Sequence, residues 1–438
     1  MRDSIPHRTP PPAGGRKRFR RATILVAAAA ALGTAVAALP GTGTASAAAS
    51  TTASVAARPA AHAAPAVAAA PTTFTHPGVM VSLPQLDYVK GKVQANAEPW
   101  KDAYDQMIGS SYASLSRTPK PRANVECGSY SNPNYGCTDE RQDAIAAYTD
   151  ALAWYITGNS AYAQKSIDLM NAWASTITEH TNSNAPLQTG WAGSVWPRAA
   201  EIIRYTYDGW SSADIAKFSD MLRNVYLPEV INGSNSNGNW ELTMMEAAVG
   251  ISIFLNDSSD YDKAIARYLN RVPAYIYLSS DGSLPKTVPG SGLNTSAQII
   301  SYWQGQSTFV DGLTQETCRD FTHTGYGIAS ISDIAETAAI QGQDLYPQVG
   351  ERLRQALGFQ SKYELGTTPP SWLCGGQLDL GLGPVTEVGF NALHNRMGIA
   401  MTNTQTLTES RRPAGTNNLF VAWETLTNAD NPAVVPGG

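Results

Sequence analysis

The chain has 438 residues, of which 43% are hydrophobic and 15% charged, and its formal net charge at pH 7 is −5. Residues 1–47 carry seven basic side chains and one acidic one; without them 24 Lys and Arg face 35 Asp and Glu, a formal charge of −11. This balance argues against nucleic acid or an anionic membrane as a partner, but it allows an acidic substrate held in a locally basic cleft.

The first 47 residues have the pattern of a secretory signal. They combine a basic segment at 16–21 ("RKRFRR"), an alanine-rich apolar stretch and a small-residue cleavage site at Ala45-Ser46-Ala47. The pair Arg20-Arg21 also suits twin-arginine export, so the Sec and twin-arginine routes both stay open. We expect a secreted, extracellular protein.

The next segment, residues 48–73, is rich in Ala, Pro and Thr and has no large apolar side chains. Such a composition cannot offset the entropy lost on ordering, so we interpret it as a disordered linker. The remaining residues, 74–438, exceed the usual size of one domain and predict either one large architecture or two domains.

From Pro77 onward, apolar residues recur at three- and four-residue steps, which is typical of amphipathic helices. Residues 141–176 predict two helices separated by a turn at Gly158-Asn159-Ser160. The pattern recurs at 194–210, 211–231, 240–257, 258–278, 324–342 and 344–365, and a final helix is predicted at 391–401.

These helical hairpins show no strict sequence repeat. We therefore predict an all-α fold, an (α/α) toroid or incomplete barrel of helical hairpins, with minor irregular or β elements such as a short one near 281–310. Loops are predicted at 178–193, 231–239 and 281–318, and long loops are where ligand chemistry is expected.

The four cysteines form an even set in a chain predicted to be exported, which favours disulfides. Cys127 and Cys137 bracket the turn-rich "GSYSNPNYG" and are predicted to pair, which leaves Cys318 with Cys374 by elimination. Metal ligation is disfavoured because no CxxC spacing occurs and His323 has no second His at ligand spacing. We predict no metal and no cofactor.

An asparagine cluster, "NGSNSNGNWELTMMEA", occupies residues 232–247. Asn239 suits the N-cap of a helix starting at Trp240, and Glu241 suits the positive end of the helix dipole. Capping explains Asn239 alone and leaves Asn237 as a candidate ligand-binding amide.

A second polar cluster, "QETCRDFTHTGYG", occupies residues 315–327. If this segment is helical, Arg319, His323 and Tyr326 share one face. A lone His is usually structural, but a cation, an imidazole and a phenol together are costly to bury, which favours a functional site.

Several aromatic residues are predicted in loops or at helix starts, where a flat ring can stack on a sugar. Core packing is the alternative for each of them taken singly. The candidates for substrate binding are Trp191, Trp240, Tyr302 and Trp303.

Four separated motifs, "WPRAAEIIRYTYDGW", "NGNWELTMMEA", "ETCRDFTHTGYGIASISDIAETAAIQGQDLY" and "FNALHNRMG", resemble the alginate-lyase-like family of bacterial polysaccharide lyases. The resemblance runs from about His76 to Pro413, in the expected order. It implies one (α/α) toroid domain over residues 74–438 and a lyase that cleaves a uronate polymer, alginate or glucuronan-like, by β-elimination, often without a metal.

The residue types suit this chemistry. Removing the C5 proton of a uronate builds negative charge beside its carboxylate, so donors or a cation must hold that carboxylate. Asn239, with Asn237 as a further candidate, and Arg319 are assigned to this role, since amides and guanidinium groups donate well to carboxylates. His323 is assigned as base or neutraliser, and Tyr326 as base and acid with Tyr302 as the alternative phenol.

Relatives that act on alginate carry an Asn-His pair in the first motif, whereas here Trp240 follows Asn239. His323 would then supply the imidazole. Glu316, three residues before Arg319, is a further binding candidate. In "NALHNR", His394 and Arg396 resemble another family motif, with a structural role as the alternative.

Two other functions are considered. An (α/α) glycoside hydrolase would use a pair of carboxylates from Glu246, Glu316 and Asp320. A non-catalytic protein that binds acidic glycans would use the same cleft without a base. We expect a monomer with an anionic polysaccharide as its partner, and neither nucleic acid nor membrane.

Overall fold

The computed structural model of the protein describes residues 70–432. The predicted secretory signal at 1–47, all but the last four residues of the predicted linker at 48–73 and residues 433–438 lie outside the described residues. The signal and linker therefore remain predictions. Among residues 70–432, no helix is both long and apolar enough to cross a membrane.

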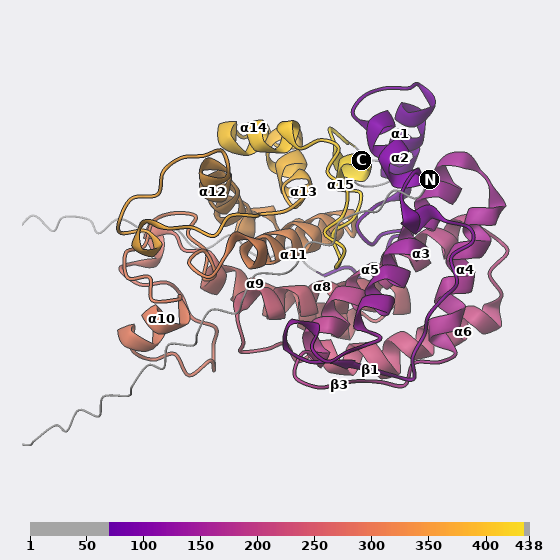
Figure 1. Ribbon diagram of the computed structural model, residues 1–438, viewed down its shortest axis with the longest axis horizontal. Coiled ribbons are helices and arrows are strands. Elements are labelled where there is room, and N and C mark those ends of the chain that lie inside the picture. Colours follow the sequence, from indigo (N-terminus) through magenta and orange to yellow (C-terminus); the bar gives the residue numbers. More distant parts are fainter. Residues whose placement is uncertain (1–69, 433–438) are drawn as a thin grey trace, which may run out of the picture. The chain divides into compact units, whose positions relative to one another are not determined.

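Helices make up most of the described chain, and many follow one another as antiparallel pairs (Figure 1). Their bounds are α1 (Leu83–Gln94), α2 (Trp100–Ile108), α3 (Cys137–Thr157), α4 (Ser160–Ala174), α5 (Ala185–Thr206), α6 (Ser212–Met221), α7 (Leu227–Val230), α8 (Gly238–Leu255), α9 (Ser258–Tyr275), α10 (Ser296–Tyr302), α11 (Phe321–Ile340), α12 (Tyr346–Glu364), α13 (Glu387–Phe390), α14 (Thr402–Ser410) and α15 (Glu424–Asn428).

Four helices, α3, α5, α8 and α11, form an inner row in which each packs against the next (Figure 1). They are buried on nearly all sides; in α8 only Trp240 and Leu255 are not fully buried. The outer helices α4, α9 and α12 pack on this row and are apolar on one face only. This two-layered arrangement of helical hairpins is an (α/α) toroid, so the predicted fold class is confirmed.

Glycines allow α5 and α8 to pack closely. A Cβ atom on Gly190 would lie 3.3 Å from the backbone nitrogen of Met244, and one on Gly193 would lie 3.2 Å from the Cβ atom of Ala247. Glycine also lowers helix propensity. The loop predicted at 178–193 is shorter than expected, because α5 already begins at Ala185.

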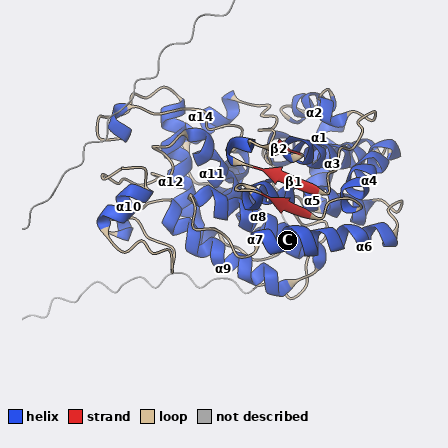
Figure 2. Cartoon of the chain, turned by 60° about the horizontal axis from the view of Figure 1, so that its bottom comes forward, coloured by secondary structure: helices blue, strands red, loops and turns tan. Residues whose placement is uncertain are grey.

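The strands form one small sheet over the ends of α3 and α5 (Figure 2). They are β1 (Asn124–Cys127), β2 (Asn134–Tyr135) and β3 (Glu179–Thr181). The central strand β1 pairs antiparallel with β2, with Glu126 opposite Tyr135, and parallel with β3, with Val125 opposite His180. The β element predicted near 281–310 is wrong, because that segment contains α10 instead.

Both predicted disulfides, Cys127–Cys137 and Cys318–Cys374, are present. The first closes the turn-rich loop between β1 and α3. The second joins the segment before α11 to the chain after α12.

The paired helices predicted at 141–176 are confirmed as α3 and α4. The helix predicted at 391–401 is not the last one. It is a π-helical segment, Asn391–Arg396, and α14 and α15 follow it.

Candidate active site

A cleft of about 530 Å³ opens where the inner helices begin. Its walls come from the start of α5, the start of α8, the segment before and at the start of α11, the end of α10 and the disulfide loop after β1. The lining residues are Ser129, Tyr130, Asn184, Leu187, Trp191, Asn235, Ser236, Asn237, Trp240, Tyr302, Arg319 and His323.

The cleft attracts anions for two reasons. The N-terminal ends of α5, α8 and α11 contribute to its lining, and each carries partial positive charge. Among residues 70–432, the lining contains one cation, Arg319, and one imidazole, His323, and no carboxylate. A second cavity of about 360 Å³, between α12 and α14, contains none of the candidate residues.

Arg319, His323 and Asp320 form a hydrogen-bonded chain at the cleft. Nη2 of Arg319 lies 3.0 Å from Nε2 of His323, and Nδ1 of His323 lies 2.7 and 2.8 Å from the two carboxylate oxygens of Asp320. A guanidinium only donates, so Nε2 accepts and Nδ1 carries the proton donated to Asp320. The imidazole is therefore neutral, with its basic nitrogen toward Arg319.

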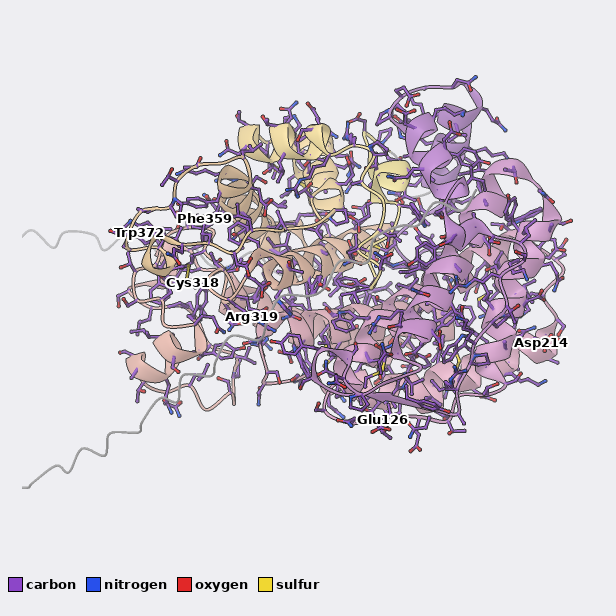
Figure 3. The ribbon with its side chains drawn as sticks, in the orientation of Figure 1. Glu126, Asp214, Cys318, Arg319, Phe359 and Trp372 are labelled. Carbon is purple, nitrogen blue, oxygen red and sulfur yellow. A yellow bond between two sulfur atoms is a disulfide. The ribbon has the colours of Figure 1, made fainter. Side chains whose placement is uncertain are left out.

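Asp320 is also the N-cap of α11, because its side chain accepts from the backbone N–H of His323 at 2.7 Å. Burial would raise the pKa of Asp320, but the hydrogen bonds from His323 and the charge of Arg319 outweigh it and lower the pKa. The helix that would place Arg319 on one face with His323 and Tyr326 does not extend to Arg319, since α11 starts at Phe321. Arg319, which is labelled in Figure 3, nevertheless meets His323 from the preceding turn.

Glu316 is a buried carboxylate that holds Arg319 in place. It accepts from Nη1 of Arg319 at 2.9 Å, from Nδ2 of Asn239 at 2.7 Å, and from the Tyr275 hydroxyl at 3.1 Å. Room for the Tyr275 ring comes from Gly238 and Gly327, where an added Cβ atom would lie 2.2 and 2.4 Å from ring atoms.

These contacts correct three expectations from the sequence. Asn239 is fully buried and its amide is engaged by Glu316, so it positions Arg319 through Glu316 and does not line the cleft. The N-cap of α8 is Asn237, two residues before the predicted cap. Glu316 is likewise fully buried rather than exposed to a ligand.

Asn237 and Tyr302 also line the cleft, from the start of α8 and the end of α10. Oδ1 of Asn237 accepts from Gln315 at 3.1 Å and Gln304 at 3.4 Å, which leaves its amide N–H groups for the cleft. The Tyr302 hydroxyl donates to the Ser236 carbonyl at 2.6 Å and accepts from Arg271 at 3.1 Å. These two hydrogen bonds fix the phenol in the wall, and burial raises its pKa.

Tyr326 packs beside the cleft, one turn after His323. Its ring makes edge contacts with His323 and Trp191, with ring centres 5.4 and 6.2 Å apart. Within residues 70–432 its hydroxyl has no hydrogen-bond partner, yet the hydroxyl is not buried. Burial of the ring and the nearby Asp320 raise the pKa of Tyr326, although Arg141 and Arg319 oppose the rise. The phenol is therefore protonated at neutral pH.

A family model described as alginate lyase matches residues 116–372, more than half of the chain. The chain belongs to the alginate lyase family. It is thus a polysaccharide lyase, as the sequence motifs predicted. No curated protein sequence matches this lyase significantly.

Solved structures show the same fold. Alginate lyase A1-III from Sphingomonas species A1 is 15% identical, with a TM-score of 0.55 over 83% of this chain and 97% of that one. An alginate lyase from Bacteroides ovatus is 14% identical, with a TM-score of 0.52 over 81% and 99%. A variant of A1-III complexed with a tetrasaccharide is 15% identical, with a TM-score of 0.50 over 77% and 91%.

Three residues that the sequence proposed for substrate binding in this lyase lie elsewhere. Trp303 is 1% exposed and packs in a small core with Phe309. His394 stacks on Phe390 and bonds the Ile399 carbonyl at 2.7 Å. Arg396 pairs with Glu336, which is 13 residues beyond His323 on α11 and thus about 20 Å away along the helix.

Other residues of the site were missed by sequence reasoning. Arg141 of α3 lies over the Trp191 ring, 5.3 Å from its centre, and donates to Gln188 at 2.5 Å. Gln188 in turn donates to Cys137 at 3.0 Å and to Glu140. Arg141 lies within α3 and belongs to no motif, so the local sequence does not distinguish it from a structural arginine.

No group of three or more His, Cys, Asp or Glu side chains within residues 70–432 is arranged to hold a metal ion. The charged groups described at the cleft are all paired with one another or with buried partners.

Proposed function

We infer that this protein is a secreted lyase that cleaves a uronate polymer of the alginate or glucuronan type by metal-independent β-elimination. The main observation is a cleft whose described lining has no carboxylate, at the N-terminal ends of inner helices. Arg319 and His323 line it, Asp320 binds His323, and the Tyr326 ring contacts the His323 ring.

The first step is binding of the uronate carboxylate. Arg319 is held by Glu316 and donates to His323, so a substrate carboxylate can replace the imidazole as the acceptor of Nη2. The amide N–H groups of Asn237 and the helix dipoles add to this attraction. Neutralising the carboxylate stabilises the negative charge that develops when the C5 proton leaves.

The same exchange activates the base. Once Arg319 turns to the carboxylate, Nε2 of His323 is free to accept the C5 proton, and Asp320 stabilises the imidazolium through Nδ1. Tyr326, protonated because its pKa is raised, donates its proton to the leaving O4. The C4–O4 bond breaks as the C4–C5 double bond forms.

The placement of these groups favours particular polymers. His323 and Tyr326 project from neighbouring turns of α11, so both approach the sugar from one side. Removal of H5 and protonation of O4 on one face suits mannuronate and glucuronate, in which these groups are on the same face of the ring. Guluronate, with H5 and O4 on opposite faces, suits this site less.

The test is a panel of polymannuronate, polyguluronate and glucuronan, with ultraviolet absorbance of the new double bond as the measurement. We expect absorbance to rise with polymannuronate or glucuronan and to rise least with polyguluronate. New reducing ends without absorbance would instead support a glycoside hydrolase. Binding of the polymer without unsaturated products or new reducing ends would support a binding protein.

Metal independence is tested with the same assay. We expect full activity after treatment with EDTA, because Arg319 and Asn237 supply the stabilisation that a cation would otherwise provide. Loss of activity in EDTA with rescue by calcium would contradict this part of the proposal.

A further inference from the structure

A small pocket adjoins the cleft behind Tyr302. It shares Asn235 and Tyr302 with the cleft lining, and its other walls come from α9 and from the loop between α9 and α10. Its volume is about 40 Å³, against about 530 Å³ for the cleft. A whole sugar ring does not fit, since pockets for small molecules usually measure ~300 Å³ or more, but a group the size of a carboxylate does.

The pocket carries a positive charge and hydrogen-bond donors. Lys286 lines it, is exposed, and within residues 70–432 has no ion pair or hydrogen bond. Thr287 and Ser291 add hydroxyl groups and Asn235 adds an amide, and no Asp or Glu belongs to the lining.

The adjacent wall has excess positive charge. Arg271 is 2% exposed and donates to Glu241 at 2.5 Å, to the Ser234 carbonyl at 3.0 Å and to Tyr302. Glu241 also accepts from Arg267 at 2.7 Å. One carboxylate therefore balances two guanidinium groups, and one positive charge remains near the pocket in addition to Lys286.

We propose that this pocket is a second carboxylate subsite, in which Lys286 binds the carboxylate of a uronate unit next to the unit that reacts at Arg319. The proposal rests on the proposed function, because it requires a substrate with a carboxylate on successive sugars. Tyr302, held by Arg271 and Ser236, is the fixed wall between the two carboxylate positions. The subsite would make binding depend on chain length and on ionised carboxylates beyond the reacting unit.

The experiment compares Lys286→Met and Lys286→Arg with the wild type on uronate oligomers of increasing length. Lys217→Met is the matched control, because Lys217 is an exposed lysine on α6 outside both the cleft and the pocket. We expect Lys286→Met to raise KM about tenfold for oligomers long enough to reach the pocket, the size expected for one charge-assisted hydrogen bond, with the effect on KM rather than kcat. Lys286→Arg should stay close to the wild type, and the shortest oligomers should show no difference.

Binding of the same oligomers is measured by calorimetry, with inorganic phosphate and acetate as competitors. An unchanged KM and affinity in Lys286→Met, with an active wild type, would overturn the subsite and leave the lyase function intact. A wild type that binds oligomers through Lys286 but forms no unsaturated product would overturn the lyase function and keep the subsite. Displacement of the oligomer by free phosphate or acetate at equal concentration would show a general anion site and overturn the proposal of a polymer subsite.

Discussion

At the scale of single residues, His323 owes its chemical state to two neighbours. Asp320 accepts a hydrogen bond from Nδ1–H and Arg319 donates to Nε2, so the imidazole is neutral but unable to act as a base until Arg319 is drawn away. A substrate without a carboxylate would leave the hydrogen bond between Arg319 and His323 in place. The geometry thus couples recognition of the uronate to activation of the base.

We expect His323→Ala and Tyr326→Phe each to lower kcat at least ~10²-fold, the lower range for losing a general base or acid. Initial rates of double-bond formation on the preferred polymer measure this. Tyr104→Phe, which removes a phenol from α2 far along the chain, is the control and should behave as the wild type. Near-normal turnover of both site variants would contradict the assigned roles.

Asp150 of α3 is a buried carboxyl outside the cleft, with no partner for either oxygen. Burial raises its pKa to about 8, although Lys165 and Arg117 oppose the rise. In the unfolded chain the group titrates near ~3.9. Between these values only the folded state holds the proton, so the free energy of unfolding falls as pH rises from about 4 to about 8.

We therefore expect Asp150→Asn to remove this pH dependence and to stabilise the protein at pH 8 and above. Because each pKa unit corresponds to about 1.4 kcal/mol, the gain has an upper limit of about 6 kcal/mol. Urea unfolding from pH 5 to pH 9 measures it. Parallel stability curves for wild type and variant would contradict the prediction.

At the scale of elements, the disulfide loop between β1 and α3 links stability to binding. The Cys127–Cys137 bond closes a loop that carries Ser129 and Tyr130 to the cleft wall. The Cys127 carbonyl also accepts from the backbone of Asn184 at 2.9 Å, which ties the loop to the start of α5. The disulfide and this hydrogen bond together hold the loop at the cleft wall.

We expect the double variant Cys127→Ser/Cys137→Ser to lose about 3 kcal/mol of stability, the chain-entropy value for a loop of this length. Its KM should rise more than its kcat falls, because the loop lines the cleft and holds none of the proton-transfer groups. Urea unfolding and initial rates check both parts. A variant with lower stability but the same KM would show that the loop does not contact substrate.

At the scale of the described residues 70–432 as a whole, a buried ionic cluster joins the inner helices. Arg198 of α5 donates to Glu246 of α8 and to Asp333 of α11, and Glu424 of α15 lies within reach of its charge. Burial raises the pKa of all three carboxyls, and Arg198 opposes this for each. This use of Glu246 in the core also removes one carboxylate that a glycoside hydrolase would need.

We expect Arg198→Met to cost about 3–5 kcal/mol, because it leaves buried carboxylates without their cation. Arg223→Met, which removes a half-exposed arginine paired with Asp220, is the control and should change stability by less than about 1 kcal/mol. Urea unfolding at one pH measures both. Equal losses in the two variants would show that the cluster does not stabilise the inner row.

The sequence by itself determined the features that depend on local pattern. Apolar periodicity predicted the hairpins α3–α4 and α8–α9, an even cysteine count with one turn-rich spacing predicted both disulfides, and the short segment 315–327 brought Arg319, His323 and Tyr326 together, since neighbours in sequence remain neighbours in space.

Only the tertiary structure decided which of several similar residues face the cleft. Trp191 and Asn237 line it, whereas Trp303 is in a core and Asn239 is held by Glu316. From distant segments, Arg141 packs over Trp191 and Lys286 lines the adjoining pocket. Which residues face the cleft depends on how α3, α5, α8 and α11 pack. Close packing between helices that are far apart in sequence produces no local sequence pattern from which it could be predicted.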